Sequence, residues 1–567
     1  MGHISTAQCK LEAGPAASTF RQYLVNVTLA KMAAELIYDV AIVGLGPAGA
    51  IAAALLGQAG LRVFVCDRTD AIYDKPRAIS LDHEVMRVFQ GLGLAQQVLP
   101  FTEPFTASEH FGAKGQMIRR LDMLAPPYPL GWTPSMVFLQ PPVEKVLRDF
   151  VLSLPNISVR LNTCLLALEQ DEHAVTLELE HRCEPQAAQK ETLRARYLIG
   201  CDGAASTVRP LANLALNDLD FDEPWLVVDL LVNDSGLKKL PPASAQFCEP
   251  ARPISFIVGT GNHRRWEIML RPGEDPTAMQ SDEQVWQLLA RWITPSDAIL
   301  WRRASYRFHA LVAERWRDRR VFIAGDAAHQ QPPFLGQGMC QGVRDVANLS
   351  WKLQAVLAGR ASDHLLDTYG VERAAHVREL TATIKQIGRY ICEQDPVKAG
   401  QRDADLLAQA GGQVKTVPRQ DLLPSLQQGL LSRRRGSAGG TLFPQPQVSH
   451  GSGQALLDDV VPAGWTLVLG DRTDDWLLAP TASLEQSIAS LRCTVVRISS
   501  ASKPGTLQET EGVLTAWFER HQCSAAIVRP DHYVYATLRS QDELIEEMLA
   551  LVDELNANSK NRPPKAE

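Results

Sequence analysis

The chain has 567 residues, of which 45% are hydrophobic and 21% charged, and its formal net charge is −7. This length exceeds one ordinary domain, and the composition is typical of a globular protein rather than a disordered one. The chain has no long basic run and no stretch of roughly 18 apolar residues, which argues against a nucleic-acid partner and against a membrane span. The lack of a membrane span predicts a soluble protein. Its cysteines stand singly, without CxxC or metal-ligand spacing, so we expect a cytoplasmic location, no disulfide framework and no metal site.

Residues 1–36 are expected to form a leader of unknown role, because they lack the apolar core and cleavage site of a signal peptide. From Ile37 the sequence reads IYDVAIVGLGPAGAIAAALLGQAGLRVFVCDRT. An apolar run, a glycine turn, an alanine-rich helix and a second apolar run follow one another. This pattern predicts a βαβ unit.

The glycine turn has the GxGxxG spacing of a dinucleotide-binding site, with Gly44 permitting the tight turn, Gly46 admitting a pyrophosphate and Gly49 allowing close helix packing. The phosphates would lie at the helix N-terminus, where free N–H groups favour negative charge. Asp67 follows Gly44 by about 20 residues, where an acidic residue binds the adenosine ribose. The alternative is a purely structural turn with Asp67 as a solvated strand end. Further candidate cofactor residues in this unit are Pro47, Ala48 and Arg68.

Later segments suggest a composite α/β protein. Residues 211–308 contain strand-like runs separated by polar turns, which predict an antiparallel sheet. The α/β pattern returns at RRVFIAGDAAH and continues into two helices. A stretch rich in Gly, Ser and Arg at 430–447 is expected to be a linker, and it leads into a small α/β domain at 440–557.

Four segments, KPRAISLDHEVMRVFQGLGL, LIGCDGAASTVR, FIAGDAAHQQPPFLGQGMCQGVRDVANLSWKL and LLDTYGVER, resemble the FAD-dependent aromatic-ring hydroxylases, the class A flavoprotein monooxygenases. The resemblance is closest to the 3-(3-hydroxyphenyl)propionate hydroxylase branch. It implies a Rossmann-like FAD-binding domain at 37–210 and 309–435 and an interleaved antiparallel substrate domain at 211–308. It also implies a thioredoxin-like domain at 440–557.

The resemblance also implies roles for single residues. Asp202 and Gly203 match a DG motif near the FAD pyrophosphate and the nicotinamide nucleotide. Gly325 and Asp326 match a GD motif whose carboxylate accepts hydrogen bonds from the ribityl chain, although Asp326 could instead cap a helical turn. Two further matches are Arg77, along the flavin diphosphate, and Gln140, near the cofactor; their alternatives are a surface arginine and a solvated amide.

Pro333 and the stretch Gly336, Gln337, Gly338 and Met339 resemble the loop beneath the isoalloxazine ring, with the next helix directing its N-terminus at the pyrimidine edge. The alternative is an ordinary helix cap. Cys340 stands where many relatives have Asn, and we expect a packed, unreactive thiol. We expect His329 to be a packing or supporting residue, and no catalytic residue is assigned.

The chemistry implied by the resemblance is hydroxylation of a phenol through a flavin C4a-hydroperoxide, formed from O2 after transiently bound NAD(P)H has reduced FAD. The leading substrate hypothesis is a 3-hydroxyphenyl alkanoate such as 3-(3-hydroxyphenyl)propionate, which would give a catechol. Alternatives are resorcinol, a hydroxypyridine or a polyketide. A flavin halogenase lacks support because no WxWxIP segment occurs, and a non-catalytic FAD module that binds an aromatic stays open.

The substrate is expected between the flavin and the central sheet. Five cations there could meet a carboxylate, although each is expected to be a solvated turn residue: Arg252, Arg264, Arg265, Arg271 and His263. In the terminal domain Cys493 and Cys523 stand alone, so disulfide exchange is not expected. A structural or oligomer-contact role is expected for that domain, which is compatible with a homo-oligomer.

Overall fold

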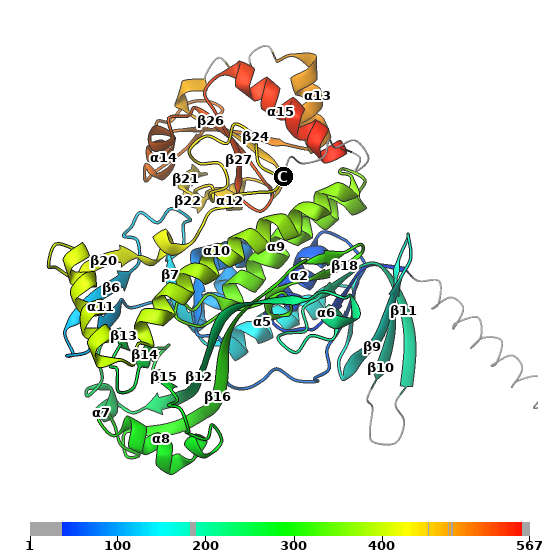
Figure 1. Ribbon diagram of the computed structural model, residues 1–567. Coiled ribbons are helices and arrows are strands. Elements are labelled where there is room, and N and C mark those ends of the chain that lie inside the picture. The colour runs from blue at the N-terminus through cyan, green and yellow to red at the C-terminus, as the bar shows by residue number, and fades with distance from the viewer. Residues whose placement is uncertain (1–36, 182–188, 452, 474–475, 478–479, 558–567) are drawn as a thin grey trace, which may run out of the picture.

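A computed structural model describes residues 37–181, 189–451, 453–473, 476–477 and 480–557, so the expected leader lies outside the described residues. The chain forms an α/β domain in the middle of Figure 1, a large, mainly antiparallel sheet at its lower left and a C-terminal domain above it. Within the described residues no helix is long and apolar enough to cross a membrane.

The α/β domain is built on parallel strands in the order β18, β11, β1, β2, β8. Its strands are β1 (Ile37–Val43), β2 (Val63–Cys66), β8 (Ile157–Arg160), β9 (Thr163–Gln170), β10 (Val175–His181), β11 (Gln189–Gly200), β17 (Arg317–Asp318) and β18 (Val321–Ile323). A small separate sheet contains β3 (Ser80–Asp82), β4 (Thr102–Pro104) and β7 (Ser135–Phe138). The predicted βαβ unit is confirmed, because β1 and β2 pair in parallel and α2 connects them.

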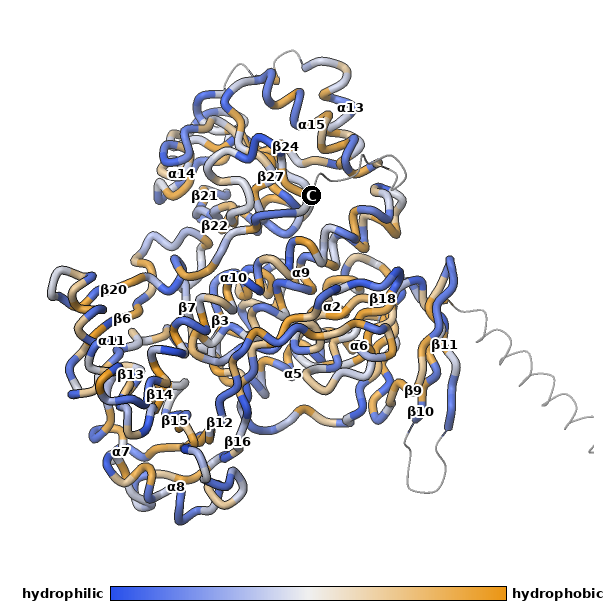
Figure 2. The backbone as a smooth tube through the Cα atoms, viewed as in Figure 1, coloured by the Kyte–Doolittle hydropathy of each residue, from blue (hydrophilic) through white to orange (hydrophobic). Residues whose placement is uncertain are grey.

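Helices cover this parallel sheet, and the alanine-rich helix α2 is buried along most of its length between α5 and α9. Because α2 is buried on nearly all sides, its sequence is almost wholly apolar. Its small side chains let it approach the neighbouring helices closely. The helices are α2 (Pro47–Gln58), α3 (His83–Gly91), α4 (Ala95–Val98), α5 (Gln140–Ser153), α6 (Val208–Leu211), α9 (Gly338–Leu357), α10 (Asp367–Ile391) and α11 (Pro396–Gln409). Figure 2 shows the apolar residues concentrated in the interior strands and helices.

The central sheet has nine strands in the order β19, β16, β12, β15, β14, β13, β5, β6, β20. Its strands are β5 (Ser108–Phe111), β6 (Met117–Asp122), β12 (Leu216–Val232), β13 (Ser244–Phe247), β14 (Ile254–Val258), β15 (His263–Met269), β16 (Ala298–Ala313), β19 (His329–Gln330) and β20 (Lys415–Pro418). The sheet thus extends beyond the expected range 211–308, because strands from both sides of that range join its edges.

Alternating residues give this sheet two different faces. Leu226, Val228 and Leu230 of β12 pack in an apolar core that also takes in residues of α8 (Asp282–Leu289), while α7 (Asp234–Leu237) lies nearby. The intervening residues Trp225 and Asp229 point to the opposite face, where Trp225 packs with α10 and with the loop before α9. We call this second surface the inner face.

The C-terminal domain has a five-stranded sheet in the order β25, β24, β23, β26, β27. Its elements are β21 (Gln447–His450), β22 (Gly453–Leu456), α12 (Leu457–Val460), β23 (Thr466–Leu469), α13 (Ala482–Leu491), β24 (Thr494–Ser499), β25 (Leu507–Gln508), α14 (Val513–His521), β26 (Ala525–Val528), β27 (Val534–Leu538) and α15 (Gln541–Asn556). The thioredoxin-like assignment stays a prediction.

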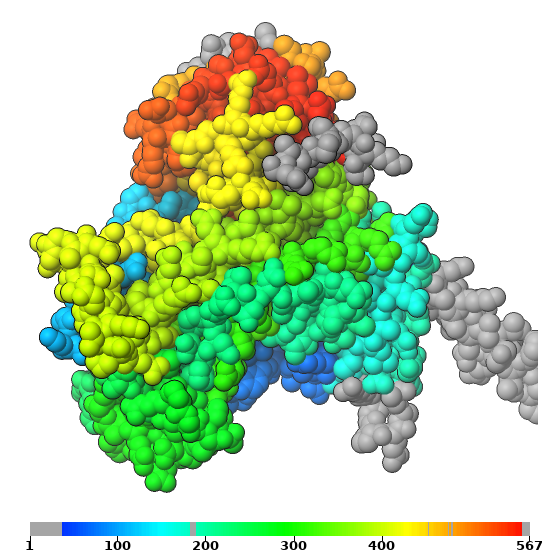
Figure 3. Space-filling model, viewed as in Figure 1, coloured from blue at the N-terminus to red at the C-terminus, as the bar shows by residue number. Residues whose placement is uncertain are grey.

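This domain lies on α9 and α10, as Figure 3 shows for the orange and red atoms above the yellow-green ones, and buried charges join them. The carboxylate of Glu372 accepts hydrogen bonds from Lys352 and Arg529, each at 2.7 Å, and all three side chains are fully buried. Residues 430–447, expected to be a linker, instead pack between the domains: Leu430 N donates to Glu372 and Ser432 N to the Tyr535 carbonyl.

Candidate flavin site

The glycine turn follows β1, and its three glycines have different neighbours. A Cβ atom on Gly44, whose φ is +100°, would lie 2.4 Å from the Cys201 carbonyl oxygen, and one on Gly49 would lie 1.9 Å from the Gly44 oxygen. The protein itself therefore requires these two glycines. A Cβ on Gly46, at the N-terminus of α2, would meet no atom within 4 Å. This open space before a helix N-terminus suits a phosphate group.

Asp67 follows β2 and faces the turn. Its Oδ2 accepts a hydrogen bond from Leu45 N at 2.6 Å, and its Oδ1 accepts from Thr69 N at 2.8 Å. The side chain is therefore held in place rather than freely solvated, and its remaining lone pairs could accept from ribose hydroxyls. Arg68 is exposed one residue further on.

Asp202 follows β11 and caps the short helix α6, since its Oδ2 accepts from Thr207 N at 2.6 Å and from Val208 N at 3.0 Å. Gly203, with φ +80°, has open space where a Cβ would stand. Arg209 ties this loop to the GD segment by donating to the carbonyl oxygen of Ala327 at 2.9 Å. The DG and GD motifs therefore lie next to each other.

Gly325 and Asp326 begin the 3-10 turn η3 (Gly325–Ala327) after β18. A Cβ on Gly325 would lie 3.4 Å from that of Ala48 in α2, which places the GD motif beside the glycine turn. Asp326 is exposed, although both its chain neighbours are buried, and within the described residues it makes no side-chain hydrogen bond. The capping alternative is therefore not observed. Loss of hydration among the surrounding groups raises the pKa of the Asp326 carboxyl, while Arg77 opposes that rise.

A network of hydrogen bonds among buried side chains stabilises the GD segment. Asp345 of α9 accepts hydrogen bonds from Gly325 N at 2.9 Å and from Arg373 at 2.9 Å, and pairs with His329 at 2.8 Å. Burial alone would raise the pKa of Asp345, but His329 and Arg373 lower it below its ordinary value. His329 also stacks on Trp316. The expected supporting role of His329 is confirmed.

Gln140 is buried, so the alternative of a solvated amide is wrong. Its Oε1 accepts from Arg77 N at 3.1 Å and Ala78 N at 2.7 Å, and its Nε2 donates to Glu144 at 3.2 Å. Gln140 thus fixes residues Pro76, Arg77 and Ala78, which we call the PRA segment, against the start of α5. Arg77 keeps its guanidinium exposed, 5.8 Å from the centre of the Tyr73 ring.

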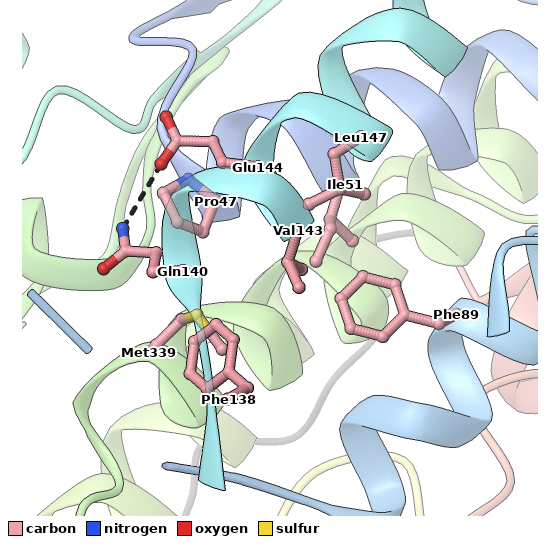
Figure 4. A pocket seen from close by; sticks show the side chains of 9 residues that line it. All are labelled: Pro47, Ile51, Phe89, Phe138, Gln140, Val143, Glu144, Leu147 and Met339. Atoms are coloured by element: carbon pink, nitrogen blue, oxygen red, sulfur yellow. Dashed lines mark hydrogen bonds between the residues drawn. The ribbon is translucent and has the colours of Figure 1, made fainter. Parts of the chain in front are cut away.

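Three helices begin around the same place. Pro47, Gln140 and Met339 stand in the first turns of α2, α5 and α9, and all three line the small pocket in Figure 4. Each helix N-terminus carries unsatisfied N–H groups and partial positive charge. Their convergence favours a bound anion or a group that becomes anionic.

The loop before α9 closes one side of this region. Gly336 has φ +63°, and a Cβ there would lie 2.8 Å from that of Ser80, whereas a Cβ on Gly338 would meet no atom within 4 Å. Pro333 closes the turn through its carbonyl oxygen, which accepts from Gly336 N at 2.7 Å. Cys340 is buried, and burial holds the pKa of its thiol well above the ordinary value. The expected packed thiol is confirmed.

Sequence reasoning missed the residue that holds this loop. The buried guanidinium of Arg344 donates to Gln337 Oε1 at 3.0 Å and also to the carboxylates of Asp82 and Glu84. Glu84 in turn accepts from Tyr533 of the C-terminal domain at 3.0 Å. The sequence signal was the adjacent charged pair Arg344 and Asp345, flanked in α9 by the apolar residues Val343 and Val346.

The five cations considered for a substrate carboxylate all have partners. Arg265 and His263 are buried and bind Asp229, so the expectation of solvated turn residues is wrong for them. Arg252 pairs with Glu274, while Arg264 and Arg271 donate to backbone carbonyls.

The fold and this site define a flavoprotein of the α/β dinucleotide-binding class. The residues fit FAD, because Gly46, Gly203 and Gly338 leave open space beside three converging helix N-termini and an exposed carboxylate. A family model described as FAD binding domain matches residues 37–383, and one described as HcaD C-terminal domain matches residues 440–552. The chain belongs to the FAD-dependent aromatic hydroxylases.

Known relatives agree along almost the whole chain. A probable NADH-specific resorcinol 4-hydroxylase from Rhodococcus jostii (strain RHA1) is 36% identical over 93% of this chain and 96% of its own length. A 3-(3-hydroxy-phenyl)propionate/3-hydroxycinnamic acid hydroxylase from Mycolicibacterium gilvum (strain PYR-GCK) is 34% identical over 89% of each chain. The solved structure of the flavin-dependent monooxygenase PieE with FAD and substrate has a TM-score of 0.76 at 22% identity, covering 92% of this chain and 100% of PieE.

Proposed function

We propose that this enzyme hydroxylates a phenol that carries a second substituent in the meta position, with NADH as reductant and O2 as co-substrate. Two kinds of relative support this substrate class, since resorcinol and 3-(3-hydroxyphenyl)propionate are both meta-substituted phenols. The structural observation that supports a ring substrate is the aromatic surface on the inner face of the central sheet, next to the loop before α9. There Trp225 lies with its ring centre 5.6 Å from that of Phe334, inside the loop before α9.

Bound FAD, once reduced, supplies the activation of O2. We assign its contacts to the residues around the open space between the three helix N-termini. These are Gly44, Gly46, Pro47, Ala48, Gly49, Asp67, Arg68, Arg77, Gln140, Asp202, Gly203, Gly325, Asp326, Pro333, Gly336, Gly338 and Met339. The chain's own contribution is to orient the phenol against the inner face and to keep water away from the reacting ring.

Two substrates fit the proposed class. A 3-hydroxyphenyl alkanoate such as 3-(3-hydroxyphenyl)propionate is the first, and resorcinol is the second. Resorcinol is favoured by a specific observation, namely that the five candidate cations already have partners, so none is reserved for a substrate carboxylate. In either case, hydroxylation next to the phenolic oxygen would give a product with adjacent hydroxyl groups.

The test measures NADH and NADPH oxidation by the FAD-loaded enzyme with both phenols and identifies the products by mass. A product heavier by one oxygen, formed with NADH, supports the proposal. NADH consumption that yields only hydrogen peroxide with every phenol would contradict the proposal, whereas binding of a phenol without NADH oxidation would favour the non-catalytic module.

Two further properties belong to this proposal. A cytoplasmic location agrees with the eight cysteines that are free within the described residues. A homo-oligomer, with the C-terminal domain as contact surface, is testable by light scattering of the purified protein.

A further inference from the structure

Glu267 is a buried carboxyl in the middle of the inner face. On β15 it lies in register between Val227 of β12 and Ser255 of β14, and only 8% of its side-chain surface is exposed. Carboxylates at such positions are normally paired and hydrogen-bonded, because an unpaired charge is costly to bury. Within the described residues the Glu267 carboxyl accepts no hydrogen bond, and its one ion-pair contact is Arg265 at 4.0 Å.

The neighbouring carboxylate of Asp229 differs from that of Glu267, because it has three close partners. It is fully buried and binds His263 at 2.8 Å, Arg265 at 2.7 Å and Arg302 at 3.1 Å. Burial opposes its ionisation, but these partners hold the pKa of Asp229 well below its ordinary value. Asp229 is therefore a satisfied structural group. Glu267 has no such set of partners, and burial raises the pKa of its carboxyl to about 7.

The side chain two residues before Glu267 on the same face reaches the PRA segment. Arg265 donates to the carbonyl oxygen of Arg77 at 2.8 Å and to that of Pro76 at 2.9 Å. Alternate residues of a strand share a face. On the inner face, Glu267 is thus the next residue of β15 after Arg265, which touches the PRA segment.

The side chain two residues after Glu267 reaches the other segment. Met269 packs in one apolar cluster with Trp225 and Phe334, the latter within the loop before α9. Glu267 is therefore bracketed on one face by contacts to both segments that we assign to FAD. A phenol held against this face between the two segments would meet its carboxyl.

Two buried histidines of the inner face are already committed to other partners. His110 binds the Tyr390 hydroxyl at 2.7 Å, and burial lowers the pKa of His110 to about 3. His263 binds Asp229, and burial lowers its pKa as well. Of His110, His263 and Glu267, only Glu267 combines a pKa near 7 with carboxylate oxygens that accept no hydrogen bond within the described residues.

The geometry points to Glu267 as the general base of the reaction: its carboxylate accepts a hydrogen bond from the substrate's phenolic hydroxyl and takes that proton as the ring is hydroxylated. The O–H bond breaks, its electron pair stays on the phenolic oxygen and enriches the ortho carbon, and the proton moves to a Glu267 oxygen. Water receives that proton when product leaves. This assignment rests on the proposed hydroxylase function.

The test compares the wild-type enzyme with Glu267→Gln, which keeps the shape and one acceptor oxygen but cannot take a proton. General-base catalysis contributes roughly 10²- to 10⁴-fold, so kcat should fall by about 10²-fold or more. The substrate dissociation constant, read from the absorbance change of the bound oxidised flavin, should change by only a few fold. Glu109→Gln is the matched control, since Glu109 lies on β5 of the same sheet but faces away and pairs with Arg120.

A series of fluorinated phenols separates a base from a structural residue. Fluorine lowers the phenol pKa, so acidic members arrive as phenolates and need no base. The deficit of Glu267→Gln should shrink steadily along the series. A structural defect would slow every phenol alike, and that result, or an unchanged kcat, would overturn the assignment.

The pH profile gives a second readout. Wild-type kcat should rise as pH passes about 7, where Glu267 ionises, and Glu267→Gln should lack this rise. The other charged groups facing it are Arg265 on its own strand, Asp229 on β12 and Arg302 on β16. The lowered pKa of Asp229 keeps it ionised in this range, and the raised pKa of Arg302 keeps it protonated. If the wild-type enzyme hydroxylates no phenol at all, the proposed function itself fails, which this comparison distinguishes from failure of the base alone.

Discussion

Gly46 and Gly44 stand in one turn but are glycines for different reasons. Gly44 has backbone atoms of Cys201 and Asp202 within 3.0 Å of where its Cβ would be, whereas Gly46 has only open space. A side chain at Gly44 would therefore disturb the fold, while one at Gly46 would disturb only a ligand. This difference makes Gly46 the cleaner test of the phosphate site.

We expect Gly46→Val to lose FAD while the fold stays intact, because the new side chain fills the space assigned to the pyrophosphate. The measurement is the flavin-to-protein ratio after purification, with circular dichroism as the check on folding. Gly91→Val is the matched control, since a Cβ at Gly91, at the end of α3, also meets no atom within 4 Å but lies outside the site. Full flavin occupancy in Gly46→Val would refute the assignment.

Asp326 is exposed and makes no side-chain hydrogen bond among the described residues, so its removal should cost the fold little. Hydrogen bonds to charged groups are worth about 1.5–3 kcal/mol, so Asp326→Ala should weaken FAD binding by roughly 10- to 100-fold. Titration of the apoprotein with FAD, followed by flavin fluorescence, measures this. An unchanged dissociation constant would remove Asp326 from the site.

At the scale of elements, α9 connects the loop before it, which we assign to FAD and call the flavin loop, with the rest of the molecule. Its Arg344 holds Gln337, Asp82 and Glu84 together, and all four side chains are largely buried. Deleting one member of a buried ion pair leaves charge uncompensated, which costs about 3–5 kcal/mol.

Arg344→Met should therefore lower the melting temperature and weaken FAD retention together, because the freed Gln337 lies in the flavin loop. Thermal unfolding followed by circular dichroism and by flavin release measures both effects. Arg360→Met is the control, since Arg360 is an exposed arginine just beyond the end of α9. A normal melting temperature in Arg344→Met would show that the buried network contributes little.

The sequence predicted the elements whose signals are local. The βαβ unit and the strand-like runs at 225–232 and 265–272 could be read from short windows. The addition of β5, β6 and β20 to the central sheet could not, because β5 pairs with β13 and β6 pairs with β20, and both partners are far away in the chain. Glu267 was missed for a related reason: its meaning depends on the lack of hydrogen-bond partners in the folded sheet, which no local pattern contains.

At the scale of the whole molecule, the C-terminal domain is joined to the α/β domain through charge. Burial alone would raise the pKa of Glu372, but Arg529 and Lys352 lower it to about 2. A carboxyl whose folded pKa is depressed contributes stability that is present above its unfolded pKa, about 4.3, and is lost as pH falls toward the folded value.

We therefore expect the two domains to lose their mutual stabilisation between about pH 4.5 and pH 2. Urea unfolding at stepped pH values, followed by tryptophan fluorescence, should show a falling midpoint in this window. Glu372→Gln should be less stable at neutral pH and should lack this part of the acid dependence. An equal acid dependence in both proteins would locate it in other carboxyls.

The strand order of the central sheet also limits how the protein can be made. Arg119 of β6 pairs with Lys415 of β20, and Leu198 of β11 pairs with Val321 of β18. A ribosome that has released the first 300 residues has therefore delivered a Rossmann half without its β18 strand and a sheet without its last edge. Strand edges of the nascent chain stay unpaired until residues up to 418 have been synthesised. Because unpaired strand edges promote aggregation, we expect this enzyme to depend on chaperones during synthesis.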